Sequence, residues 1–523
     1  MIYSIKQLIV VMVLATMIFH FGRPLALRFM SEEDFSRRRN VWFALTVTAF
    51  LSPSFWLFAL VAIPLMVWAG RKDSNPIAFY LMLLHVIPSI PTEIPVVGIG
   101  ELFELDNYRL LSLCVLIPTA WRVRRLKDRA RIQRLEIMDY LLLAYGAVQV
   151  ALYVPPDLPH HVILPNSFTN DLRRAFLFYV DVYALYFAVS RTCTSARAIV
   201  EAQAAFCLAS AVMALIAGFE SLRHWLLYAE MSLRWNPLLP AWNFYITRGD
   251  TVRAAASAGV SLALGYLLAI AFGFWLYLQL KVKSKLKRVF VVLLFWLGLI
   301  SAYSRGPWIG AVSIYFAFAA LGPRFAPRLL KAAGIAVFMV GAISITPLGQ
   351  RIFNVLPYFG GTVDSANIVY RERLAERSWE LIKVHPYFGN QLAYSQMEDL
   401  RQGQGIIDLV NTYASVALLY GLVGLSFFVG FILTGLFKAY FRARSSQLAD
   451  PEFALLGACL VSCIAGTLLM IENCSLIFGY EKMFYVLAGF AAAYAHLGAV
   501  STDARSKSHL PQRGKPVQRN GGR

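Results

Sequence analysis

Long apolar runs separated by short polar segments dominate the chain. They lie near 5–21, 41–51, 54–70, 77–97, 107–121, 137–155, 173–190, 197–218, 256–279, 289–303, 307–321, 332–347, 411–437, 453–471 and 483–500. A helix needs about 20 apolar residues to cross a bilayer, and barrel strands would instead alternate apolar with polar residues. The pattern therefore predicts an all-α, polytopic transmembrane helical bundle of about 12–15 spans.

The composition supports a membrane protein and excludes several other classes. Of 523 residues, 58% are hydrophobic and 15% are charged, whereas soluble domains have about 25% charged residues. A soluble enzyme, a disordered chain and a collagen-like fibre are excluded. The net charge of +19 is concentrated in segments such as 122–134, 281–288 and 505–523. Such clusters beside apolar runs mark cytoplasmic segments, so we expect the lipid bilayer, and no nucleic acid, as their partner.

The polar segments suggest four regions. We expect transmembrane helices with short loops over 1–347, including an external loop at 219–255, and one large external loop over 348–409. C-terminal transmembrane helices would follow over 410–500, and a basic, disordered cytoplasmic tail over 501–523. Long loops in compact proteins are usually functional, so we expect any chemistry to face outward.

Nucleotide and metal motifs are missing from the sequence. It contains no Walker loop, dinucleotide glycine fingerprint, HExxH or GxSxG, and its six cysteines lack the histidines or further cysteines of a zinc site. We therefore expect no cofactor and no metal. Any reaction must use an already activated substrate.

Arginines at the outer ends of apolar runs are the main candidates for substrate binding. Arg253 opens one run with Arg248 just before it, and Arg305 lies in a Ser-Arg-Gly-Pro-Trp break between two others. An arginine inside a span is costly and normally faces a cavity or a partner, and its planar fork suits phosphate oxygens. The alternative is that these side chains reach toward lipid head groups or close a helix end.

The large loop contains a helical pattern over 370–386 that ends at Pro386. Its acidic and basic residues form adjacent stripes: Glu372, Glu376 and Glu380, then Arg373 and Arg377. A surface helix with Arg373–Glu376 and Arg377–Glu380 pairs explains this pattern. The functional alternative is an arginine-lined cap over a diphosphate, with Glu372 or Glu376 as general base.

Further polar candidates lie near the end of the loop and inside the spans. His385 is either structural or catalytic, and Asp408 either activates an acceptor hydroxyl or caps a helix. Asn411 and Tyr413 follow at the mouth of a span. The isolated acids Asp181 and Glu472 lie within apolar runs, where a transporter would use them as proton relays.

These features resemble the O-antigen ligase and polysaccharide polymerase superfamily of bacterial envelope proteins. The matching motifs are Arg-Ala-Ala-Ala-Ser-Ala-Gly (253–259), Ser-Arg-Gly (304–306), Arg371 followed by His-Pro-Tyr-Phe-Gly (385–389), and Asp-Leu-Val-Asn-Thr-Tyr (408–413) followed by Gly-Leu-Val-Gly-Leu (421–425). The likeness covers roughly residues 245–440.

The resemblance implies an inverting, metal-independent glycosyltransferase at the periplasmic face of the bacterial inner membrane. Its substrate would be a glycan linked to undecaprenyl diphosphate. The implied diphosphate-binding residues are Arg253 and Arg305, with Arg371, Arg248 and Arg377 in support, and Asn411 and Tyr413 would contact the acceptor glycan. The catalytic candidates are Asp408, Glu372, Glu376 and His385. A chain-length regulator or a polysaccharide exporter would be the expected protein partner.

One departure from the family pattern guides the choice of function. Ligases carry a histidine before Asn-x-Tyr, where this chain has Val410, and valine can neither accept a proton nor bond a hydroxyl. We therefore predict a polymerase that joins lipid-linked oligosaccharide repeats. A ligase to lipid A core or protein, a lipid or polysaccharide transporter and a non-catalytic scaffold are the alternatives.

Overall fold

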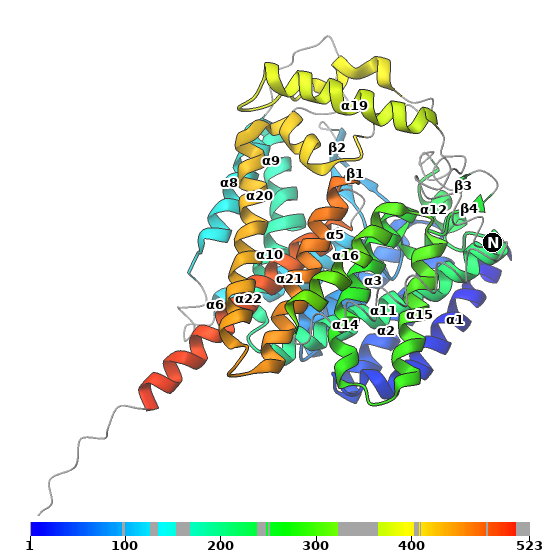
Figure 1. Cartoon of the computed structure of the whole chain (residues 1–523). Coiled ribbons are helices and arrows are strands. Elements are labelled where there is room, and N and C mark those ends of the chain that lie inside the picture. Colours follow the sequence, from blue (N-terminus) through cyan, green and yellow to red (C-terminus); the bar gives the residue numbers. More distant parts are fainter. Residues whose placement is uncertain are drawn as a thin grey trace, which may run out of the picture.

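A computed structural model describes residues 2–96, 100–125, 134–152, 168–237, 247–248, 251–322, 365–401, 407, 409–476 and 480–508. These residues form a helical bundle with one helix lying across its upper end (Figure 1). The predicted all-α, polytopic fold is confirmed. Asp408, the run at 332–347, residues 348–364 of the large loop and the tail beyond Ser508 lie outside the described residues.

The helices follow the apolar runs closely. In the first half they are α1 (Ile2–Ala26), α2 (Glu32–Leu51), α3 (Phe55–Lys72), α4 (Pro76–Leu83), α5 (Asn107–Leu111), the π-helix η1 (Ser112–Leu116), α6 (Ile117–Arg125), α8 (Ile137–Ala151), α9 (Phe168–Phe178), the π-helix η3 (Tyr179–Tyr183), α10 (Ala184–Thr192) and α11 (Ala196–Arg223).

The second half continues in the same way. Its helices are α12 (Ala229–Trp235), η4 (Ala256–Ala258), α14 (Ser261–Leu278), η5 (Gln279–Lys281), α15 (Lys285–Ser301), α16 (Arg305–Leu321), α19 (Ser365–Val384), η6 (Ala393–Leu400), α20 (Thr412–Ser446), α21 (Pro451–Glu472) and α22 (Glu481–Ser508). Two antiparallel hairpins, β1 (Thr92–Val96) with β2 (Gly100–Leu105) and β3 (Thr247–Arg248) with β4 (Thr251–Val252), complete the described elements.

Six of the described helical segments are long and apolar enough to cross a membrane. They are Ser4–Ala26, Phe55–Lys72, Ala196–Arg223, Ser261–Lys281, Thr412–Ser446 and Pro451–Glu472. The chain is therefore a multi-pass membrane protein. Several other predicted spans are built from short helices joined by π-turns, as in α5–η1–α6 and α9–η3–α10.

Two segments differ from the sequence-based expectation. The apolar run at 77–97 forms a helix only as far as Leu83 and then leads into the β1–β2 hairpin, because the closely spaced Pro88, Pro91 and Pro95 cannot continue a helix. At the other end of the chain, α22 continues through Ser508, into the tail that we expected to be disordered.

Ion pairs join the helix ends that lie at the end of the bundle opposite α19 in Figure 1. The ion pairs there include Arg38 with Asp73 and Glu201, Arg191 with Asp139, and Lys438 with Glu136. Burial raises the pKa of the Glu136 carboxyl, but hydrogen bonds from His496 and Lys438 outweigh burial and lower that pKa to about 2. This end also carries the basic segment at 281–288, and we call it the basic end.

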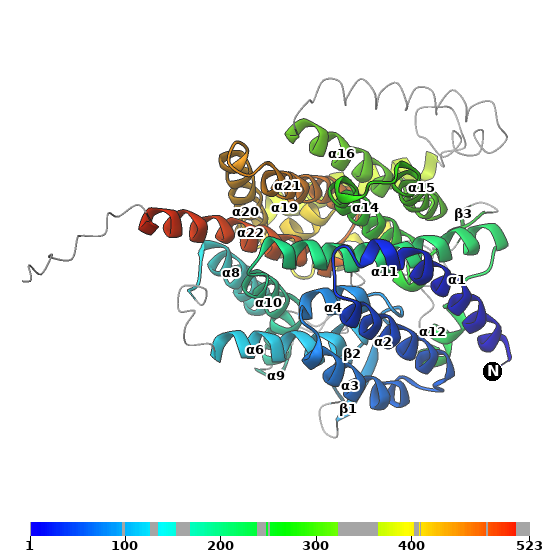
Figure 2. The same ribbon diagram turned by 90° about the horizontal axis from the view of Figure 1, so that it is seen from below.

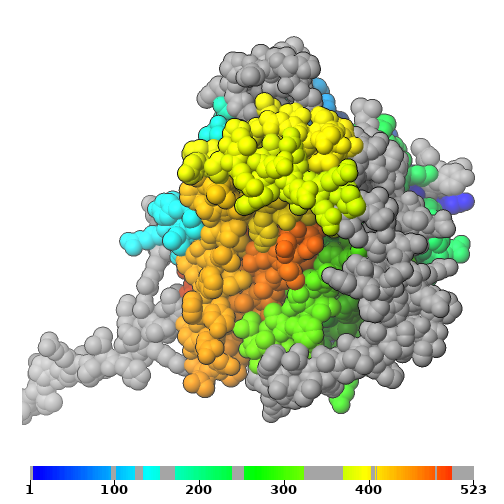
Figure 3. Space-filling model, turned by 45° about the horizontal axis from the view of Figure 1, so that its top comes forward, coloured from blue at the N-terminus to red at the C-terminus, as the bar shows by residue number. Residues whose placement is uncertain are grey.

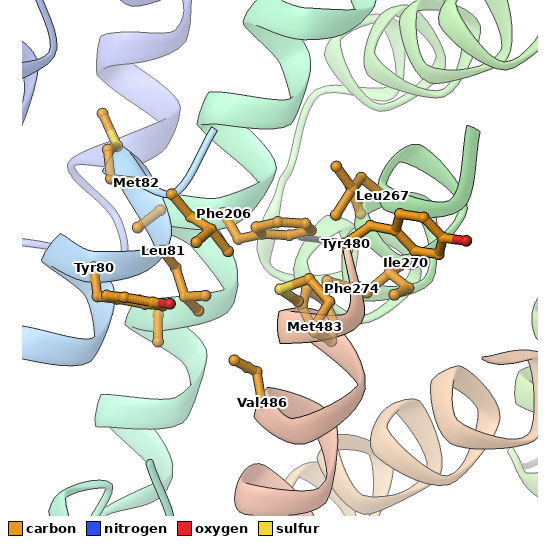
Figure 4. Close-up of a cluster of buried hydrophobic side chains, with 14 of the residues drawn as sticks. Tyr80, Leu81, Met82, Phe206, Leu267, Ile270, Phe274, Tyr480, Met483 and Val486 are labelled. Atoms are coloured by element: carbon orange, nitrogen blue, oxygen red, sulfur yellow. The ribbon is translucent and has the colours of Figure 1, made fainter. Parts of the chain in front are cut away.

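Helix α11 is the central element of the bundle. Figure 2 shows it running between α1, α2 and α4 on one side and α14 and α15 on the other. In Figure 4, Phe206 of α11 lies among apolar side chains from α4, α14 and α22, including Leu81, Phe274 and Met483. Residues far apart in the sequence therefore share one core around α11.

Candidate functional site

The turn that carries Arg253 is attached to the upper end of α15. The Arg253 side chain is partly buried, and its Nε donates to the carbonyl of Ala302 at 3.4 Å. The backbone N–H of Ala254 donates to the carbonyl of Ser301 at 3.0 Å. These bonds place Arg253 beside the segment that leads into Arg305.

Arg305 is the first residue of α16 and follows a strained turn. Ser304 is the N-cap, and Tyr303 before it has a φ of +45°. A left-handed backbone is unusual for an aromatic residue, and such strain is often found at functional sites. A helix N-terminus also favours anions through its unpaired N–H groups and its dipole. Arg253, 52 positions earlier in the sequence, thus lies beside the segment that leads into a helix N-terminus suited to negative charge.

A second left-handed residue, Ala256, shapes the Arg253 turn. Ala255 has φ −121° and ψ −24°, and Ala256 has φ +45°. Successive residues of this kind form a concave nest of N–H groups that binds anions. Here the nest holds the Glu220 carboxylate, whose Oε2 accepts from the N–H groups of Ala255 and Ala256 at 3.0 and 2.8 Å.

Sequence reasoning missed Glu220 because it lies just past the apolar run at 197–218, in a segment that we assigned to an external loop. Helix α11 continues to Arg223, and Glu220 is only 1% exposed. The available signal was an isolated acid at a span end, the same signal that singled out Glu472.

The third part of the site is the start of α20, which is attached to the end of α21. The Thr412 hydroxyl donates to the carbonyl of Cys474 at 2.7 Å, and the Tyr413 hydroxyl to that of Leu468 at 2.9 Å. The Asn411 side-chain oxygen caps α20 by accepting from the N–H of Ala414. The structure thus gives Asn411 and Tyr413 anchoring bonds within the site.

The ends of α16, α20 and α21 lie together. Asn473 follows α21, and a Cβ built on Gly306 would lie 3.7 Å from the Cβ of Asn473. Val410, which stands at the ligase histidine position, has a φ of +49°. That value is rare for a β-branched residue, so this position keeps an unusual backbone without the histidine. Glu472, at the last position of α21, is exposed beside this group.

Helix α19 confirms a helix in the predicted range 370–386, and it ends at Val384, two residues before the proline. Leu374, Leu381 and Ile382 are buried and pack in one cluster with η6 and the start of α20. We call α19 and η6 together the cap. Figure 3 shows the cap over the upper ends of α20 and α21, with α16 beside them.

The charged candidates on α19 differ in exposure from the two arginines of the bundle. The side chains of Arg371, Glu372 and Glu376 are exposed, whereas those of Arg253 and Arg305 are partly buried. The predicted Arg377–Glu380 ion pair is present at 2.9 Å.

The His-Pro-Tyr-Phe-Gly motif docks into a break in α20. Gly421, with φ +65° and ψ −171°, interrupts that helix. The N–H of Leu422 donates to the Pro386 carbonyl at 2.8 Å, and that of Asn390 to the Leu418 carbonyl at 2.8 Å. His385 itself is exposed at the end of α19. Two motifs of the resemblance, at 385–389 and 421–425, therefore fit into each other.

Two of the remaining candidates are placed as follows. Arg248 belongs to the β3–β4 hairpin just before Arg253, and only its backbone is described. Asp181 is held by two cations, with its Oδ1 2.8 Å from Lys482 Nζ and its Oδ2 3.0 Å from Arg109 Nε. Such pairing favours a carboxylate that keeps its charge, which is unfavourable for a proton relay.

The arrangement offers cationic groups and a helix N-terminus to an anionic ligand. Among the described residues, no group of three or more histidines, cysteines, aspartates or glutamates has the geometry of a metal site. An arginine pair beside a helix N-terminus stabilises a diphosphate through charge-assisted hydrogen bonds. This is the chemistry that the described part of the site supports.

Comparison with known proteins agrees with these motifs. A model of the O-antigen ligase family matches residues 289–429. The match includes the Arg305 turn, α19, the docked 385–389 motif and the start of α20, and Arg253 precedes it. No curated protein matches the chain.

Proposed function

We propose, from the premise that this chain belongs to the O-antigen ligase and polysaccharide polymerase superfamily, that it is an envelope polysaccharide polymerase. It would transfer undecaprenyl-diphosphate-linked oligosaccharide repeats to a growing glycan. The observation that carries the proposal is the meeting of Arg253 with the Ala302–Arg305 segment, inside or next to the family match.

The reaction needs no metal and no nucleotide because its donor is already activated. The acceptor hydroxyl oxygen attacks the anomeric carbon of the donor, and the bond from that carbon to the diphosphate oxygen breaks. The lipid diphosphate leaves with the bonding electrons, and the hydroxyl proton passes to a carboxylate. Preorganised donors such as Arg253 and Arg305 would stabilise the charge that develops on the diphosphate.

Val410 favours a polymerase over a ligase, since valine cannot act as the base or as an acceptor-binding donor. Asp408, two residues earlier, is our first choice for the proton acceptor, and Glu372, Glu376 and His385 are the other candidates. A ligase that transfers glycan to lipid A core or protein is the second candidate function, because its family's model is the one that matches.

The distribution of charge supports a localisation that we also propose. If the basic end is cytoplasmic, as the positive-inside rule favours, the Arg253–Arg305 site would lie at the periplasmic face of the inner membrane. A chain-length regulator or a polysaccharide exporter would be the natural protein partner there.

Reconstitution separates the candidate functions. Purified protein in lipid vesicles receives undecaprenyl-diphosphate-linked repeat units, with and without lipid A core, and glycan length is read on gels. A ladder in whole repeats without added core supports the polymerase. Transfer that requires core identifies a ligase, and no transfer in either case contradicts both.

The arginine pair is tested in the same assay. Arg305→Lys and Arg253→Lys keep the charge but lose the planar fork, so each should reduce the rate by about 100-fold, the typical cost of losing one preorganised donor. Arg28→Lys is the matched control, because Arg28 donates to the Lys281 carbonyl at the basic end. Near-normal polymer from Arg305→Lys would remove Arg305 from the site.

A further inference from the structure

Glu220 is a buried carboxylate that, among the described residues, is held by backbone N–H groups. It is 1% exposed, and its oxygens accept from the N–H groups of Leu227, Ala255 and Ala256 at 2.9, 3.0 and 2.8 Å. Burying a carboxylate is costly unless it is hydrogen-bonded, and bonds to a charged acceptor are stronger than neutral ones. The cost of burying the Glu220 carboxylate indicates that its hydrogen bonds have a structural role.

Glu220 holds the turn that presents Arg253. Ala255 and Ala256 are the second and third residues after Arg253, and the left-handed φ of Ala256 is disfavoured for alanine in isolation. The two hydrogen bonds from the nest to Glu220 Oε2 stabilise that conformation. Without them, the turn would relax toward ordinary backbone angles and would carry Arg253 with it.

Other bonds fix the opposite side of the same turn. The Ser257 hydroxyl donates to the carbonyl of His85 at 2.6 Å, and the N–H of Ala254 donates to the carbonyl of Ser301 at 3.0 Å. The turn is thereby fastened to α11 by Glu220, to the segment after α4 by His85 and to α15 by Ser301. Arg253 directly precedes the four residues, 254–257, that make these contacts.

The occupied nest also limits how an anionic substrate can bind. In phosphate-binding loops, a nest of N–H groups contacts the phosphate directly. Here the N–H groups of Ala255 and Ala256 are used by Glu220, so this turn can contact a diphosphate only through side chains such as Arg253. The Glu220 carboxylate occupies the position that a phosphate takes in such loops. The nest therefore stabilises the turn before α14 and does not bind substrate.

We propose that Glu220 is a positioning residue that holds Arg253 in the orientation required to bind the lipid diphosphate next to Arg305. This inference rests on the proposed function, because it assigns the ligand of that site as a lipid diphosphate. Glu220 acts through Arg253 and does not touch the substrate.

The test compares two buried glutamates of one helix. Glu220→Gln keeps the side-chain size, but its amide offers one acceptor oxygen in place of two, so its NH2 group must face either the N–H groups of the nest or that of Leu227. Glu201→Gln is the matched control, because Glu201 lies in the same helix and binds Arg38 at the basic end. The readouts are the Kd for undecaprenyl diphosphate, KM and kcat in the polymer assay, and thermal stability.

We expect Glu220→Gln to raise the Kd and the KM by about 10-fold or more, since small displacements of a binding group have effects of this size. Glu201→Gln should lower thermal stability and leave the Kd within about 2-fold, because it acts far from the site. Glu220→Asp should be intermediate. Ser257→Ala, which removes a single bond from the other side of the turn, should raise the Kd about 3-fold.

The outcomes are distinct. An unchanged Kd in folded Glu220→Gln, or an equal rise in Glu201→Gln, overturns the positioning role. If Glu220→Gln does not fold, Glu220→Asp and Ser257→Ala decide the question, and an unchanged Kd in both overturns it. A wild-type protein that does not bind undecaprenyl diphosphate overturns the proposed function itself, and with it this inference.

Discussion

The two ends of α11 hold their buried carboxylates in different ways. At the basic end, Glu201 Oε1 binds the Arg38 guanidinium at 2.7 Å, and the same guanidinium binds Asp73. At the other end, Glu220 binds three backbone N–H groups. The two residues are separated by about 28 Å along the helix, close to the thickness of a bilayer core.

The difference shows which part of the structure each carboxylate stabilises. A guanidinium that bridges two carboxylates joins three helical segments, but it constrains the backbone between them only weakly. A carboxylate in a nest fixes φ and ψ of particular residues, here Ala255 and Ala256. The basic end is therefore built to hold helices together, and the other end to hold a turn in an unfavourable shape.

The largest effect is expected from Arg38→Met. Arg38 is 0% exposed, and its loss would leave Asp73 and Glu201 buried without their cation, which typically costs about 3–5 kcal/mol. Thermal unfolding of the purified protein measures the loss. Arg39→Met is the control, because Arg39 is only partly buried and, in the described contacts, pairs with Asn40 and the Phe35 ring and with no carboxylate. Equal stability of the two variants would contradict a clamp at the basic end.

A smaller effect is expected from Gly421→Ala, which tests the backbone docking at the outer end. Gly421 has a φ of +65°, and a Cβ there would overlap the Tyr387 carbonyl. Strain at such a position costs about 1–3 kcal/mol. Limited proteolysis should then cleave the 385–391 segment faster. Gly430→Ala in the same helix would place its Cβ 3.8 Å from Leu141 and should leave the cleavage rate unchanged.

The smallest effect is expected from Ala256→Gly. Glycine accepts the left-handed φ of +45° without steric cost, although it also gains freedom in the unfolded chain. The net change in the free energy of unfolding should therefore be stabilising by less than about 1 kcal/mol. Ala254→Gly is the control and should destabilise by about 0.5–1 kcal/mol, because Ala254 is buried and is not among the left-handed residues. Destabilisation by Ala256→Gly as large as that control's would contradict a strained turn.

Elements set by local sequence were predicted well. The end of α19 just before Pro386 follows from that proline. The resemblance also identified Arg253 and Arg305 as candidates, and the structure brings their segments together.

The supports of the site were not predictable in the same way. The bond from Ala256 to Glu220 joins positions 36 apart in the sequence, and no local pattern specifies such a contact. Ala256, Tyr303 and Val410 adopt left-handed angles that their own propensities oppose, so only tertiary contacts can impose them. These exceptions lie in the motifs at 253–259, 304–306 and 408–413 or directly beside them.

The docking of the cap onto α20 also constrains how the protein is made. The 386–390 segment docks onto the break around Gly421. Because residue 421 follows the segment in the sequence, the break is synthesised later than the segment that docks onto it. The cap therefore stays undocked during synthesis until α20 has been made and its break has formed. Assembly of the outer surface is for this reason a late event in biogenesis, coupled to the insertion of a single helix.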